Sequence, residues 1–199
     1  MKTFAPSHPA EALIVARIAP AVLERAREVR LMAFDVDGVL TDGHLWYGEN
    51  GEAIKCFHAL DGQGLRLLLD SGIEVALVTG RHGPILARRA ADLGISLVMQ
   101  GVRDKSKAID ELAQEHGCAL GQIGYMGDDI IDLSVLQRVG FAASVPDAPA
   151  YVAQAAHWVA TQRGGSGAVR ECCDLILASK GRLSAFLTPT ALTMAGATQ

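Results

Sequence analysis

The chain has 199 residues, half of them hydrophobic and a fifth charged, with a formal net charge of −4. This balance is that of one globular domain with a substantial core, and it excludes a disordered chain. The negative charge gives no general attraction for nucleic acid or for an anionic membrane, so neither is expected as a partner. An anionic substrate would have to be held by a few placed cations and a metal ion.

The N-terminal part is predicted to be a tail followed by a helix. Residues 1–9 read as a loose tail, and residues 10–29 as a helix that Pro20 interrupts. The apolar run 12–22 contains Arg17, is too short to span a bilayer and lacks a secretory cleavage site. The four cysteines lack the paired spacing of a zinc site, so reduced thiols are expected. Together these features predict a cytoplasmic protein.

Short apolar runs then alternate with helical patterns. The first run, 31–34, ends abruptly in Asp35, as a buried strand with polar groups at its C-terminal tip would. Strands that alternate with helices form βαβ units, so the predicted fold class is α/β, a doubly wound Rossmann-like parallel sheet. The further strands are expected near 73–78, 96–99, 123–126 and 141–145, and the helices near 61–71, 83–93, 104–116, 129–139, 147–155 and 168–178.

One segment interrupts this alternation directly after the first strand. The pattern from His44 to Phe57, with Asn50-Gly51 at its turn, predicts a β-hairpin. Its Trp46 and Tyr47 are expected to form an exposed contact surface. The stretch Gly164-Gly165-Ser166-Gly167 is expected to be a flexible joint. The predicted organisation is a tail and helix over 1–29, a single domain over 30–180 with a hairpin at about 44–57, and a C-terminal tail over 181–199 that is frayed from Pro189.

Polar side chains gather where the predicted strands end. Asp35 and Asp37 follow the first strand, and Thr79 follows the second. Lys105 opens the helix after the third strand, and Asp128 follows the fourth. Ligands of open α/β sheets bind beyond the carboxyl ends of the strands, so these side chains are expected to share one site. Their neighbours there are Gly80, Arg81, Asp129 and Asp132.

These residue types are the ones that phosphoryl transfer requires. A carboxylate such as Asp35 can attack phosphorus and so divide one difficult displacement into two easier steps. Asp37 can protonate the leaving alkoxide and later deprotonate the attacking water. Mg²⁺ held by carboxylates would offset the negative charge, while Lys105 and the Thr79 hydroxyl hold phosphoryl oxygens. The pattern therefore predicts a magnesium-dependent phosphatase that works through phospho-Asp35.

The ordered set Asp35-Val36-Asp37-Gly38-Val39, Thr79, Lys105 and Gly127-Asp128 with Asp132 resembles the four motifs of the haloacid dehalogenase superfamily of phosphatases. Each motif is weak alone, but the four in order are specific. The resemblance implies that Asp35 is the nucleophile, that Asp37 is the general acid and base, and that Thr79 and Lys105 bind the phosphate. It also implies Mg²⁺ as the cofactor, held by Asp35, the Asp37 backbone carbonyl and Asp128, with Asp129 and Asp132 behind these ligands.

The spacing of the motifs leaves no room for the cap domain that usually covers the site in this superfamily. Within the superfamily, residues 31–180 resemble a capless branch that includes phosphatases of 3-deoxy-D-manno-octulosonate 8-phosphate (KDO 8-phosphate), enzymes of lipopolysaccharide sugar synthesis. This resemblance implies a homotetramer in which a neighbouring subunit covers the site. It is carried by Phe34–Gly43, Phe57–Gly62, Val78–Arg81, Gln100-Gly101 and Gly164–Glu171.

The same resemblance implies the substrate contacts. A sugar acid carries a carboxylate beside its phosphate, and arginine side chains suit both anions. Arg170 matches a segment that reaches a neighbouring subunit's site. Positions 58 and 60 hold His and Leu where some members have Asn and Arg. The implied contacts are Asp37, His58, Ala59, Leu60, Asp61, Gly62, Arg66, Thr79, Gly80, Arg81, Arg89, Lys105 and Arg170.

Two other functions remain open at this point. One is the same chemistry on a different acidic sugar, such as a nine-carbon ulosonate 9-phosphate. The other is a non-enzymatic signalling receiver that accepts phosphate on an Asp. Receivers place that Asp at the tip of the third strand, whereas the segment Gln100–Asp104 begins without one. The phosphatase is therefore the favoured prediction.

Overall fold

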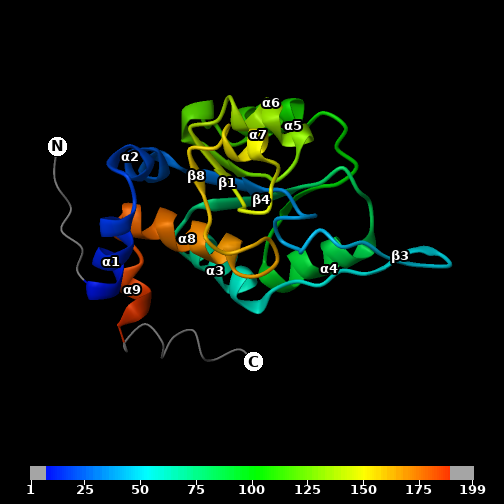
Figure 1. Cartoon of the computed structure of the whole chain (residues 1–199), viewed down its shortest axis with the longest axis horizontal. Helices are drawn as coiled ribbons and strands as arrows, with labels where there is room; N and C mark the ends of the chain where they lie inside the picture. The colour runs from blue at the N-terminus through cyan, green and yellow to red at the C-terminus, as the bar shows by residue number, and fades with distance from the viewer. Residues whose placement is uncertain (1–7, 189–199) are drawn as a thin grey trace.

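At the centre of the computed structural model lies a parallel sheet of six strands (Figure 1). The strands are β1 (Leu31–Phe34), β4 (Glu74–Val78), β5 (Leu97–Met99), β6 (Ile123–Met126), β7 (Phe141–Ser144) and β8 (Trp158–Val159). Their spatial order is β5-β4-β1-β6-β7-β8. The chain runs outward from β1 through β4 and β5 and then crosses to β6 on the other side of β1. The strand order thus reverses between β1 and β6, and ligands of doubly wound sheets bind at such a point.

Helices cover both faces of this sheet (Figure 1). Along β1, Met32 and Phe34 face one apolar cluster, whereas Leu31 and Ala33 face the other, because successive side chains of a strand point to opposite faces. Each large apolar side chain buried in this way contributes about 1.5–3 kcal/mol relative to exposure. The first cluster is completed by α3 (Ala59–Asp70), α4 (Pro84–Leu93) and α8 (Ala168–Ser179), and the second by α5 (Lys105–Glu115), α6 (Leu133–Leu136) and α7 (Ala150–Ala153).

The predicted hairpin is present as β2 (Trp46–Gly48) and β3 (Gly51–Ile54), an antiparallel pair that projects from the body of the molecule (Figure 1). It turns through Glu49-Asn50. Trp46 is 57% exposed and Tyr47 is 63% exposed, as expected for these two aromatic residues. The hairpin and its exposed aromatic surface are therefore confirmed, with strands shorter than predicted.

The glycine-rich stretch 164–167 is not a flexible joint. It packs against the loop that follows β1: the N–H of Gly165 donates to the carbonyl oxygen of Val39 at 2.9 Å. A Cβ on Gly164 would overlap the carbonyl oxygen of Gly38. The prediction of a joint was wrong, because these glycines permit close backbone contact instead of a change of direction.

Asp61 fastens the end of this stretch to α3. Its carboxylate accepts the backbone N–H of Gly167 at 3.2 Å and that of Arg170 at 2.8 Å. At Gly64, one turn further along α3, a Cβ would lie 3.1 Å from the Cα of Arg170. The absence of a side chain at position 64 therefore lets α3 and α8 approach closely.

The structure describes residues 8–188, and its N-terminal part contains two short helices instead of the single one predicted for 10–29. These are α1 (Pro9–Arg17) and α2 (Pro20–Glu28). Pro20 begins α2, since a residue without an N–H can start a helix but cannot continue one. Both helices pack on α8 outside the sheet, as expected. Most of the predicted tail lies outside the described residues.

A further short helix, α9 (Ser184–Leu187), lies in the segment predicted to be a C-terminal tail. Leu183 is buried, and the N–H of Ser184 donates to the buried carboxylate of Glu11 at 2.8 Å. The first part of this segment is therefore folded against α1. The frayed end predicted from Pro189 lies outside the described residues.

The remaining differences concern short elements. The helical pattern predicted for 129–139 is a 3-10 turn, η2 (Ile130–Asp132), followed by α6, and the pattern for 147–155 is helical only in α7. A second 3-10 turn, η1 (Leu120–Gln122), precedes β6. The two-residue strand β8 was missed because so short a run has no readable periodicity. Between residues 8 and 188, the helices are all too short or too polar to cross a bilayer.

Candidate active site

The predicted site residues converge at the carboxyl ends of the central strands. Asp35 directly follows β1 and Thr79 directly follows β4, and both are buried. Asp128 lies just beyond β6, and Lys105 begins α5. Carboxylate oxygens of Asp35, Asp128 and Asp132 all lie within 4.8 Å of one another. The structure thus brings together side chains from four separate segments.

Lys105 is the central cation of this cluster. Its Nζ lies 2.7 Å from Oδ2 of Asp35 and 2.7 Å from Oδ1 of Asp132. Burial disfavours the charge on Lys105, but the two carboxylates outweigh this effect and raise its pKa. Lys105 therefore stays charged at neutral pH and holds Asp35 in a fixed position.

Asp132 organises the loop behind the site. Its Oδ1 accepts the Tyr125 hydroxyl at 2.6 Å as well as Lys105. Its Oδ2 accepts the backbone N–H groups of Asp128 and Asp129, each at 3.1 Å. Both oxygens of Asp132 therefore accept hydrogen bonds from protein donors. The Asp129 side chain is exposed and accepts the N–H of Ile130 at 2.7 Å.

The buried charges of the cluster do not balance. Burial raises the pKa of Asp35 to about 6, and Asp132 adds to this effect while Lys105 opposes it. Burial also raises the pKa of Asp128 to about 8, reinforced by Asp35 and Asp132. Three carboxyl groups therefore share a single lysine, and the site favours an additional positive charge.

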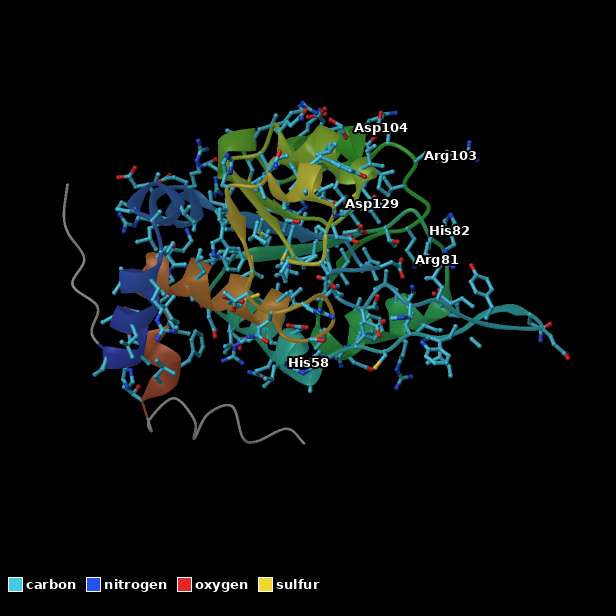
Figure 2. All side chains as sticks on the ribbon, viewed as in Figure 1. His58, Arg81, His82, Arg103, Asp104 and Asp129 are labelled. Carbon is cyan, nitrogen blue, oxygen red and sulfur yellow. The ribbon has the colours of Figure 1, made fainter. Side chains whose placement is uncertain are left out.

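Asp37 faces the hairpin instead of this cluster. Its Oδ1 forms an ion pair with Nζ of Lys55, and the Thr79 hydroxyl donates to its Oδ2 at 3.4 Å. Thr79 Oγ1 in turn accepts the N–H of Arg81 at 3.1 Å. Figure 2 labels Arg81 beside the base of the hairpin. Asp35 and Asp37 thus have separate partners, which allows two carboxyl groups in one site to take different roles.

Known proteins match both the sequence and the fold. Residues 94–170 match the family model of haloacid dehalogenase-like hydrolases. Over 165 residues the chain is 45% identical to the 3-deoxy-D-manno-octulosonate 8-phosphate phosphatase KdsC of Haemophilus influenzae, covering 83% of this chain and 92% of that protein. The chain belongs to this phosphatase family.

Solved structures agree with this assignment. The phosphatase of this name from Yersinia pestis superposes with a TM-score of 0.82 and is 44% identical, covering 84% of this chain and 90% of the other. The Moraxella catarrhalis phosphatase, solved with a magnesium ion, a phosphate ion and a KDO molecule, has a TM-score of 0.81 and 40% identity, covering 83% and 95% of the two chains. The predicted α/β class and superfamily are therefore confirmed.

The carboxylates of the cluster suit Mg²⁺, which prefers oxygen ligands. Oδ1 of Asp128 is buried and has no hydrogen-bond partner within residues 8–188. Gly38 has φ +92°, and a Cβ there would overlap the Asp128 carboxylate, so the loop leaves this carboxylate unobstructed. Asp35 and Asp128 consequently fit as magnesium ligands. The Asp37 carbonyl remains the third ligand that the family resemblance implies. Asp132 fits less well, because protein donors already occupy its oxygens.

The residues at the start of α3 fall into two groups. His58 precedes the helix and is half-buried, and Ala59 and Leu60 are exposed, so all three are open to a ligand or a neighbouring subunit. Asp61 is only 1% exposed and its carboxylate holds backbone N–H groups of the α8 segment. The structure therefore argues against the predicted substrate contact at Asp61, because its carboxylate oxygens are enclosed and already accept hydrogen bonds. Gly62 is likewise buried.

The predicted arginine contacts are spread over different parts of the chain. Arg81 lies closest to the carboxylates, with its Nε 4.0 Å from Oδ2 of Asp37, and follows the exposed Gly80. The Arg89 guanidinium lies 5.8 Å from the centre of the Phe57 ring. Arg66 is exposed on α3. Arg81 is thus the arginine best placed to reach a substrate held by Asp35.

Arg170 has a different environment from Arg81. Its Nε donates to Asp174 on the same helix at 2.9 Å. Together with Leu60 it lines a hollow of about 780 Å³ between α8 and the N-terminal helices, and Asp35, Thr79, Lys105 and Asp128 do not line this hollow. Within the described part of one subunit, Arg170 is therefore separate from the carboxylate cluster.

Four residues of the site were not predicted from the sequence: Tyr47, Glu52, Lys55 and Tyr125. Tyr125 could have been predicted, because it is the one residue with a polar side-chain group in the otherwise apolar, buried strand β6. The hairpin residues gave a weaker signal, because charged residues on a hairpin are usually solvated. Only the folding of the hairpin beside Asp37 shows that Lys55 and Glu52 belong to the site.

Proposed function

We propose that this chain hydrolyses KDO 8-phosphate to KDO and inorganic phosphate in lipopolysaccharide sugar synthesis, with Mg²⁺ as its cofactor. The observation that carries the proposal is the convergence of Asp35, Lys105 and Asp128 at one sheet edge in a member of this phosphatase family. The complex of the Moraxella catarrhalis relative with magnesium, phosphate and KDO supports both the cofactor and the product.

In the first step, the Asp35 carboxylate attacks phosphorus and the bond from phosphorus to the sugar oxygen breaks. The departing oxygen takes a proton from Asp37, which leaves Asp37 as a carboxylate. Lys105 keeps Asp35 in position and offsets negative charge as the two anions meet. The Thr79 hydroxyl lies beside Asp37 and is proposed to donate to a phosphoryl oxygen. Bound Mg²⁺ neutralises charge on the phosphoryl oxygens.

In the second step, water attacks the phosphorus of phospho-Asp35. Asp37 takes the proton of that water, and the bond from phosphorus to the Asp35 oxygen breaks. Inorganic phosphate leaves, and Asp35 is restored as a carboxylate. Asp37 thereby returns to its protonated state for the next substrate.

The sugar contacts are proposed from position and charge. Arg81 stands next to Asp37 and is 32% exposed in its side chain, so it can meet the anionic sugar acid as it enters. His58, which precedes α3, and Arg89 on the neighbouring helix α4 line the same small hollow. Gly80, next to Thr79, is exposed and has no side chain that would obstruct a substrate there. Arg66 and Arg170 remain candidates for contacts further from phosphorus.

We also propose a homotetramer that forms through the hairpin. The exposed side chains of Trp46, Tyr47 and Ile54, between 57% and 63% exposed, give the hairpin an apolar surface that a partner could bury. Sedimentation of the purified protein measures the assembly. A Trp46→Ser/Ile54→Ser variant should sediment as a smaller species, and an active wild-type monomer would refute the tetramer.

The proposed location is the cytoplasm. All four cysteines are free thiols in the structure, and Cys172 and Cys173 are buried side by side in α8. Free thiols are usual in a reducing compartment. Fractionation of cells that express the protein tests this location, since recovery with the periplasmic contents would contradict it.

The proposed substrate is tested by measuring phosphate release from a panel of sugar phosphates with Mg²⁺ present. KDO 8-phosphate should give the highest kcat/KM. If kcat/KM is about tenfold or more higher for a nine-carbon ulosonate 9-phosphate, the proposed substrate is wrong and only the phosphatase chemistry is retained.

A further inference from the structure

A buried lysine at the end of the hairpin, Lys55, contacts the candidate acid–base residue, Asp37. Lys55 follows β3, and its side chain is only 5% exposed. Its Nζ contacts Oδ1 of Asp37 and lies 2.8 Å from Oε1 of Glu52. Because a lysine is rarely buried without a partner, this double ion pair fixes Lys55 and Asp37 relative to each other.

Arg81 is a second cation near the same two carboxylates. Its Nε is 3.7 Å from Oε1 of Glu52 and 4.0 Å from Oδ2 of Asp37. Its guanidinium also donates to the Tyr47 hydroxyl and lies 5.5 Å from the centre of that ring. The Arg81 side chain is more open to solvent than that of Lys55, so Lys55 is the more enclosed of the two cations near Asp37.

The two oxygens of Asp37 consequently have different surroundings. Lys55 occupies Oδ1. Among the described residues, Oδ2 is approached by the Thr79 hydroxyl at 3.4 Å, a long hydrogen bond, and by Arg81 at 4.0 Å. Oδ2 is therefore the oxygen left for a reacting group.

We propose that Lys55 is a positioning residue for Asp37. It holds Oδ1, so that Oδ2 faces the sugar oxygen in the first step and the attacking water in the second. The proposal rests on the proposed function, in which Asp37 gives and takes the proton. It also makes the hairpin part of the acid–base machinery and not only a surface for assembly.

The test compares two esters whose leaving groups differ in their need for a proton. A sugar alkoxide must be protonated as it leaves, whereas p-nitrophenolate leaves unaided. For Lys55→Met we expect kcat on KDO 8-phosphate to fall roughly 10- to 100-fold, with KM changed by less than about twofold. With p-nitrophenyl phosphate the variant should release a rapid burst of p-nitrophenolate and then turn over slowly, because phospho-Asp35 lacks a positioned base.

Three further variants separate positioning from simple stabilisation. Lys55→Arg should restore part of the lost activity, because it returns a cation to Asp37. Glu52→Gln should show a weaker form of the same pattern, and it keeps the proposal testable if Lys55→Met does not fold. Lys107→Met is the matched control, since the Lys107 side chain is 74% exposed on α5 and its nearest carboxylate, on Glu111, is 3.8 Å away. It should behave as wild type.

The proposal is overturned if Lys55→Met and Glu52→Gln lower kcat equally on both esters and give no burst. That result would indicate a purely structural role for Lys55. A rise in KM for KDO 8-phosphate with kcat unchanged would also overturn it, since Lys55 would then be a substrate contact. If the wild type cleaves p-nitrophenyl phosphate but not KDO 8-phosphate, the proposed substrate fails. The burst experiment still decides the role of Lys55 in that case.

Discussion

The charge imbalance around Asp128 predicts that Asp128→Asn stabilises the metal-free protein. In the native state, the pKa of Asp128 is raised from its ordinary value of 3.8 to about 8 by burial and by the nearby charges of Asp35 and Asp132. The native state therefore binds a proton more tightly than the unfolded state, and the free energy of unfolding falls as pH rises from about 4 to about 8. Asparagine has nearly the same shape and no charge, so the variant avoids this loss.

The magnitude follows from the shift in pKa. At about pH 7 the difference between 3.8 and about 8 corresponds to an upper limit of about 4 kcal/mol. Asp128 is partly open to water, which screens the charge, so we expect a gain of about 1–2 kcal/mol in the free energy of unfolding. For a chain of this size that gain raises Tm by about 2–8 °C.

The assay is urea or thermal unfolding of both proteins, in EDTA and in excess Mg²⁺, at about pH 5 and about pH 8. In EDTA the advantage of Asp128→Asn should be larger at the higher pH. In Mg²⁺ the order should reverse, because the wild type gains a ligand that the variant binds weakly. Asp129→Asn is the matched control: its side chain is exposed on the same loop, and asparagine can still accept the N–H of Ile130. If Asp128→Asn is less stable than wild type in EDTA at about pH 8, the electrostatic reasoning is refuted.

Four other perturbations test the site and the contacts that support it. EDTA should abolish turnover, and Asp35→Asn should do so without unfolding the protein; a labelled phosphoryl group trapped on another residue would overturn the nucleophile assignment. Tyr125→Phe should lower the free energy of unfolding by about 1.5–3 kcal/mol, since it removes a hydrogen bond to a buried carboxylate, and a change below about 0.5 kcal/mol in urea unfolding would contradict this role. Gly164→Ala should reduce kcat strongly because its Cβ would displace the carbonyl of Gly38, whereas Gly121→Ala, which meets open space, should not; equal kinetics for the two would argue against this contact.

Much of the fold was predictable because its signals are local. The run Leu31–Phe34 is entirely apolar and ends at Asp35, so both the buried strand and its polar tip can be read from adjacent residues. The same holds for the hairpin around Asn50-Gly51 and for the interruption of the N-terminal helical pattern at Pro20. Parallel strands all present their carboxyl ends at one edge, so the meeting of Asp35 with Asp128 followed from strand direction alone.

The tertiary structure decided which partner each polar group takes. Lys55 is as polar as any solvated hairpin lysine, and only the folding of the hairpin against the loop after β1 pairs it with Asp37. Asp61 has the sequence context of a substrate contact, but the approach of α8 to α3 gives its carboxylate two backbone N–H groups instead.

The role of the glycine-rich stretch 164–167 was also decided by the tertiary structure. Glycine is equally suited to a flexible joint and to tight backbone contact, and the choice depends on whether another segment lies within reach. Here the loop after β1 lies against Gly164 and Gly165, although more than a hundred residues of chain separate the two segments. The sequence by itself determined five strands of the sheet, the polar residues at their carboxyl ends and the chemistry that these residues can perform. Contacts between distant segments decided the rest, because the energy of a hydrogen bond or an ion pair depends on distances that residue spacing along the chain does not contain.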